Sequence, residues 1–110
     1  MSLPINEKEI NEVLRLVSVD PQAALDEANR LLDRSAHRKD TSYVLLHNLM
    51  AGSALRLHRE ELADRYIRDG LAVDDNPHLY NTRAAIYRQM GRLDEALEAV
   101  NHAILLQGDA

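Results

Sequence analysis

The sequence predicts an all-α protein of about six helices that stack as antiparallel pairs. The composition supports this fold class, because Ala, Leu, Glu and Arg dominate while Phe, Trp and Cys do not occur. Apolar residues recur three or four positions apart between capping residues, which is the period of an amphipathic helix. Two long stretches of the chain also match each other at a constant offset, which indicates a repeated unit.

Length, composition and net charge limit the classes of protein to which this chain can belong. A chain of 110 residues corresponds to one domain, and 45% apolar and 28% charged residues are ordinary values for a folded protein. No apolar run is long enough to span a bilayer, and the start lacks the basic and then apolar pattern of a secretory signal. We therefore expect a cytoplasmic protein without a membrane partner. The net charge of -5 and the scattered Lys and Arg residues argue against nucleic acid as a partner.

Capping residues set the bounds of the first two predicted helices. Asn6 can cap a helix whose third residue, Glu9, reaches back to the cap, and this helix should end near Ser18. Asp20 followed by Pro21 begins the second helix, since proline is favoured at the first helical position. The residues expected on the buried face of the second helix are Ala24, Leu25, Ala28, Leu31 and Leu32.

The third and fourth predicted helices follow a polar segment that ends at Asp40. The third helix runs from about Thr41 to about Leu57, and its cap is Asp40 or Thr41. The fourth helix runs from about Glu60 to Val73. Its pattern of apolar residues faces one side, so the other side should face water.

Capping residues, proline and glycine also set the bounds of the last two predicted helices. Asn76 and Pro77 open a fifth helix that runs to Met90 and stops at Gly91, a residue suited to a left-handed cap. The sixth helix spans about Leu93–Gln107. No segment alternates with period two for long enough to predict a strand.

An internal repeat is the most informative feature of the chain. The stretch from Tyr80 to Leu106 aligns with the stretch from His47 to Val73 at an offset of 33 without a gap. Small residues align with small ones and large with large, so two helical hairpins should superpose. The aligned pairs include Asn48 with Asn81, Ala63 with Ala96, Gly70 with Ala103, and Leu71 with Ile104.

These residues resemble the tetratricopeptide repeat family, whose unit is a pair of helices of about 34 residues. The match is closest in the second copy, where Tyr80 takes the bulky early position, Ala84 the small mid-helix position and Gly91 the turn. In the first copy His58 replaces the turn glycine. The resemblance implies a right-handed superhelical stack of helix pairs, a solenoid.

The resemblance also divides the single domain, residues 1–110, into three units. Residues 76–110 form a tetratricopeptide repeat and residues 41–75 a repeat-like unit. Residues 1–40 form a degenerate or capping helix pair, in which only the second helix can be aligned with the family pattern.

In this family the first helices of successive pairs line a concave groove that binds a peptide or a partner helix. The resemblance implies that eight residues of this chain line such a groove. They are Asn48, Gly52, Leu55 and Arg56 on the third helix, and Asn81, Ala85, Arg88 and Gln89 on the fifth. Asparagine amides can hold a peptide backbone, and arginines can add charge. Family members that grip a terminal carboxylate use lysines there, whereas Lys8 and Lys39 of this chain lie outside these positions.

The predicted sixth helix is apolar around more of its circumference than one neighbouring helix can cover. Leu97, Ile104 and Leu105 are therefore candidates for an oligomer interface. Coverage by the first helix, or by a further part of a longer protein, would also account for the surplus. Ordinary exposure of two leucines is the simplest alternative.

These features lead to two expectations about function. The first is a protein-protein interaction module, an adaptor or chaperone-like scaffold that binds a peptide or helix of a partner protein in the groove. The alternative is an oligomerisation or regulatory segment that uses the sixth helix as its interface, with a homo-oligomer as the result. The sequence contains no nucleophile–base–acid set, no glycine-rich phosphate loop and no histidine pair at helical spacing. We therefore expect neither an enzyme nor a cofactor or metal site.

Overall fold

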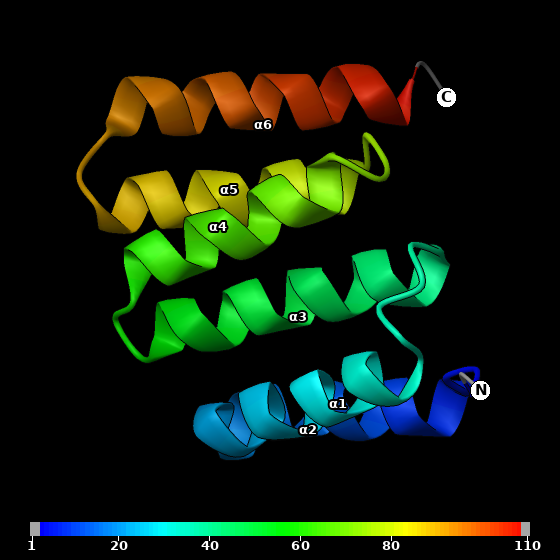
Figure 1. Cartoon of the computed structure of the whole chain (residues 1–110). Helices are drawn as coiled ribbons and strands as arrows, with labels where there is room; N and C mark the ends of the chain where they lie inside the picture. The colour runs from blue at the N-terminus through cyan, green and yellow to red at the C-terminus, as the bar shows by residue number, and fades with distance from the viewer. Residues whose placement is uncertain (1–2, 109–110) are drawn as a thin grey trace.

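The computed structural model describes residues 3–108, and within that range all regular structure is helical (Figure 1). The predicted all-α class with six helices is therefore confirmed. The helices are α1 (Glu7–Val19), α2 (Pro21–Arg34), α3 (Thr41–Arg56), α4 (Glu60–Leu71), α5 (Pro77–Gln89) and α6 (Leu93–Gln107). The extreme ends of the predicted units 1–40 and 76–110 lie outside the described residues.

The predicted caps form hydrogen bonds at the starts of the helices. Asn6 and Glu9 form a reciprocal capping box on α1, with N···O distances of 2.9 and 3.1 Å. The side chain of Asp20 caps α2 by accepting a bond from the backbone of Ala23 at 3.1 Å. At α3 the capping residue is Asp40 rather than Thr41, because its carboxylate accepts the backbone N–H of the third helical residue.

Four helices end one or two residues away from the predicted position. α1 extends one residue past Ser18, and the other three end early, before Leu57, Val73 and Met90. Val73 turns out of the helix with a shorter-range bond, since its N–H donates to Gly70 O at 3.0 Å, whereas Leu57 and Met90 still donate to the carbonyl four residues earlier. Such tightening of the final turn leaves no mark in the apolar pattern.

The helices pack in a regular order along the chain. Each helix contacts the next one, and α1 contacts α3 as α3 contacts α5 (Figure 1). In the described range no Cα atoms of α2 and α4, or of α4 and α6, lie within 8 Å of each other. α1 and α6 are not in contact either, which excludes coverage of α6 by the first helix.

The buried interior has two parts that share α3. One part joins α1, α2 and α3 around Leu31 and Leu46, and the other joins α3, α4 and α5 around Ile67 and Leu79. These four side chains are fully buried. α6 buries only its alanines, Ala96, Ala99 and Ala103, against the rest of the molecule.

Candidate protein-binding surfaces

The eight predicted groove residues lie on two helices that contact each other, α3 and α5. Four of them are exposed, namely Arg56, Asn81, Arg88 and Gln89. The other four, Asn48, Gly52, Leu55 and Ala85, are half-buried. We call the surface formed by these eight residues the α3–α5 face.

Asn48 is held by a contact between the two helices. The hydroxyl of Thr82 donates to Asn48 Oδ1 at 2.6 Å. One acceptor of the amide is therefore used to join α3 to α5, while its N–H donors have no such bond. Thr82 was not among the predicted residues, although it directly follows Asn81, the repeat equivalent of Asn48.

Gln89 also has a structural role. Its amide donates to the Leu55 carbonyl at 3.2 Å and to Glu60 Oε1 at 2.8 Å. The hydrogen bond from Gln89 lowers the pKa of the Glu60 carboxyl below its usual value. Gln89 thus ties the end of α5 to the end of α3 and the start of α4, and it is less free to bind a ligand than Arg88.

Gly52 faces α1. A Cβ at this position would lie 3.9 Å from Val17 Cγ1, an ordinary van der Waals contact. Gly52 therefore lies at the junction between α1 and α3.

Leu45 belongs to the same face of α3 and was not predicted. It is exposed and precedes Asn48 by three residues, which places both on one side of the helix. Leu45 and Lys39 line a crevice of about 340 Å³ beside the α4–α5 loop, with Val73 on the opposite wall. The i, i+3 spacing was the signal that would have identified Leu45.

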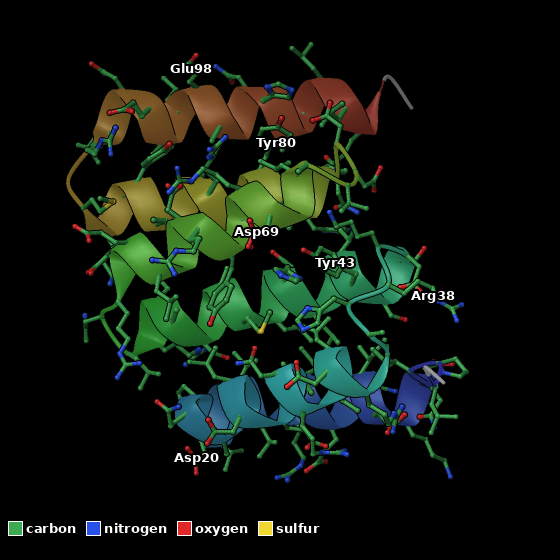
Figure 2. The ribbon with its side chains drawn as sticks, in the orientation of Figure 1. Asp20, Arg38, Tyr43, Asp69, Tyr80 and Glu98 are labelled. Atoms are coloured by element: carbon green, nitrogen blue, oxygen red, sulfur yellow. The ribbon has the colours of Figure 1, made fainter. Side chains whose placement is uncertain are left out.

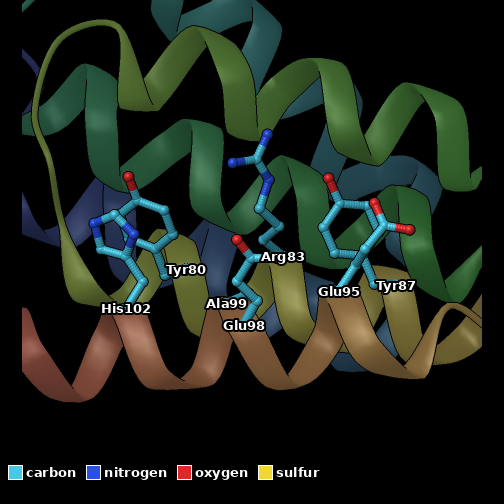
Figure 3. A pocket seen from close by; sticks show the side chains of 7 residues that line it. All are labelled: Tyr80, Arg83, Tyr87, Glu95, Glu98, Ala99 and His102. Atoms are coloured by element: carbon cyan, nitrogen blue, oxygen red, sulfur yellow. The ribbon is translucent and has the colours of Figure 1, made fainter.

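A second crevice, of about 170 Å³, lies between α5 and α6 (Figure 3). At one end Tyr80 stacks on His102, with ring centroids 4.0 Å apart, and Figure 2 shows Tyr80 beneath α6. The Tyr80 hydroxyl donates to Asp75 at 2.6 Å, and this bond raises the pKa of Tyr80.

Two of the three charged side chains that line the α5–α6 crevice, Arg83 and Glu95, lie near an opposite charge, whereas Glu98 forms no ion pair with the described residues. Arg92 pairs with Glu95 and lies over the Tyr87 ring, 4.8 Å from its centroid. Arg83 Nε lies 3.9 Å from Asp64 Oδ1. The volume is also below the roughly 300 Å³ of small-molecule sites. This crevice therefore offers little to a ligand.

α6 exposes large apolar side chains. Leu97, Ile104 and Leu105, the predicted interface residues, are all exposed, as are Leu93 and Val100. The apolar surplus expected from the sequence is thus present on the surface.

The part of the chain that the structure describes contains neither a metal-binding cluster nor a membrane-spanning helix. Within residues 3–108 no three His, Asp or Glu side chains gather where they would hold a metal ion. None of the helices in that range has the length and apolar character to cross a bilayer. No family model, curated protein or solved structure matches the chain.

Proposed function

We propose that the chain is a protein-interaction module of tetratricopeptide-like helix pairs that binds a peptide or helix of another protein on the α3–α5 face. One observation carries the proposal. The first helices of successive pairs are in contact, α1 with α3 and α3 with α5, whereas the second helices, α2, α4 and α6, do not contact one another. A stack whose helices lie closer together on one side than on the other is curved. Because the first helices lie closer together, they form the inner surface of the curve. The 33-residue repeat supports the same architecture.

The chemistry of the face indicates the kind of partner. Arg56 and Arg88 are exposed near the ends of neighbouring helices and can bind carboxylates. Asn81 is exposed and offers both donors and an acceptor to a peptide backbone. Leu45 adds an apolar contact. The partner that fits this set is a segment with acidic residues at one end and an apolar side chain roughly 16 Å away, because Leu45 precedes Arg56 by eleven residues of the same helix.

Titration with a panel of acidic–apolar peptides, followed by backbone amide NMR, tests the proposal. Binding should shift the amides of α3 and α5, and the double variant Arg56→Glu/Arg88→Glu should weaken it by tenfold or more (about 1.4 kcal/mol). Arg38→Glu/Arg65→Glu is the matched control, because both arginines are exposed and lie off this face. Equal weakening in the two double variants, or shifts confined to other helices, would contradict the proposed face.

A further inference from the structure

α6 carries a continuous apolar stripe on the side that α5 does not cover. The stripe consists of Leu93, Leu97, Val100 and Ile104, whose exposed fractions are 64%, 61%, 37% and 58%. Their spacing of four, three and four residues places them along one side of the helix. The buried alanines of α6 lie on an adjacent side, against α5.

The internal repeat shows what this side of a helix does one unit earlier. At the offset of 33, the stripe corresponds to Glu60, Asp64, Ile67 and Leu71 of α4. This is the side of α4 against which α5 packs. Glu60 accepts a bond from Gln89, Asp64 lies near Arg83, and Ile67 is fully buried. The stripe on α6 therefore lies on the side against which a further helix would pack.

The side of α4 that packs against α5 and the equivalent side of α6 differ in chemistry. Where α4 has Glu60 and Asp64, α6 has Leu93 and Leu97. A helix like α5 would place a polar residue such as Arg83 against leucine, and burying an unpaired charge is costly. The helix that fits α6 must therefore be apolar along its whole contact line.

We propose that the occupant is α6 of a second copy of this chain, packed antiparallel about a two-fold axis. The spacing of four, three and four residues is the same from either end of the stripe. Antiparallel packing therefore places each of the four residues opposite a stripe residue of the second copy. Leu93 then lies opposite Ile104 of the second copy, and Leu97 opposite Val100 of the second copy. Self-complementarity of this kind is what a two-fold interface requires.

The residues beside the stripe are compatible with this packing. Asp94 and Asn101 are exposed and lie along the same edge of the stripe. Antiparallel packing brings Asp94 next to Asn101 of the second copy, where an amide can donate to the carboxylate. Leu105 lies about 100° around the helix from Ile104, so it remains in water. The proposed interface thus keeps Leu97 and Ile104 of the sequence-predicted set and omits Leu105.

Mass measurement by sedimentation equilibrium over a range of concentrations tests the proposal. The wild-type chain should be a dimer, and Leu97→Glu should raise the dissociation constant by roughly a hundredfold, because each dimer would then bury two charges in an apolar contact. Leu105→Glu is the matched control, since Leu105 is 79% exposed on the same helix and lies off the stripe. Circular dichroism should show both variants folded, because both positions are exposed in a single copy.

Cysteine cross-linking tests the register, since the chain has no cysteine of its own. The double variant Leu93→Cys/Ile104→Cys should form disulfide-linked dimers. Each single variant should not, because identical positions would lie about 16 Å apart along the helices, beyond the reach of a disulfide. A monomer at every concentration would overturn the proposal, as would equal effects of the Leu97 and Leu105 variants or efficient cross-linking of a single variant. Peptide binding to the α3–α5 face is measured separately, so each proposal can fail alone.

Discussion

Two glycines within helices, Gly52 and Gly70, have different neighbours. A Cβ at Gly70 would lie 3.1 Å from a methyl carbon of Leu79 and 3.6 Å from the Cβ of His47. Leu79 is fully buried and has little room to move. A Cβ at Gly52 would have no neighbour closer than 3.9 Å. A Cβ would therefore crowd Leu79 at position 70, whereas position 52 has room for one.

Alanine substitutions should separate these two cases. Gly52→Ala should raise the free energy of unfolding by about 1 kcal/mol, because alanine favours the helix. Gly70→Ala should lower it by about 1 kcal/mol, because overpacking against Leu79 exceeds the same gain in helix propensity. Urea denaturation measures both values. A stabilised Gly70→Ala variant would show that Leu79 can move away at little cost.

Whether the hydrogen bond of a given residue could be predicted depended on how far apart in the sequence its two partners are. The caps at Asn6 and Asp20 were predicted correctly, because each bonds a backbone group within three residues. The bonds of Asn48 and Gln89 join residues 34 positions apart. Helical spacing says which side of a helix a residue occupies, but not which atom of another helix lies within 3 Å. The sequence therefore assigned these residues to two helices, while the structure was needed to show that the amides of Asn48 and Gln89 are already engaged.

The turns within the second and third helix pairs have the same backbone geometry with different residues. His58, between α3 and α4, has a φ of 59°, and Gly91, between α5 and α6, has a φ of 79°. The two positions are equivalent in the repeat. The left-handed region is accessible to glycine and costs other residues about 1 kcal/mol or more. The helix pair therefore imposes this conformation on histidine.

Exchanging the turn residues should change stability in opposite directions. His58→Gly should raise the free energy of unfolding by about 1 kcal/mol, and Gly91→Ala should lower it by about the same amount. A Cβ at Gly91 would have no neighbour within 4 Å, so its effect should come from the backbone alone. Thermal unfolding followed by circular dichroism gives both values. Loss of stability in His58→Gly would mean that the 3.4 Å contact between His58 and Gln89 outweighs the backbone cost.

The helices themselves were largely predictable, because capping and apolar period act within a few residues. The starts of all six helices agree with the prediction. At α4 and α6 no side chain forms a cap bond, yet the predicted starts at Glu60 and Leu93 agree with the structure. The helix ends were less predictable, since tertiary contacts decide how the last turn opens.

At the scale of the whole molecule, burial is uneven along the stack. α3 contributes to both parts of the interior and buries residues on several sides, whereas α5 is the one helix that α6 contacts within the described range. Local opening should therefore cost little free energy at α6 and much more at α3.

Native-state amide hydrogen exchange should show this gradient. In dilute solution the amides of α3 should exchange slowest and those of α6 fastest among the helices. Raising the protein concentration should slow exchange at α6 if the stripe binds a second copy. Leu97→Glu is the reference in which this concentration dependence should vanish. Equal protection of α3 and α6 at the lowest concentration would contradict the gradient.

The two ends of the stack differ, and the difference limits how copies can join. On α1 the exposed apolar residues Leu14 and Val19 are five positions apart and do not share a side, and an ion pair between Glu12 and Arg15 lies beside them. The α1 end therefore offers no counterpart to the α6 stripe. Among the described residues α1 thus offers no matching surface for head-to-tail growth into a filament, so the association proposed for α6 would join two copies.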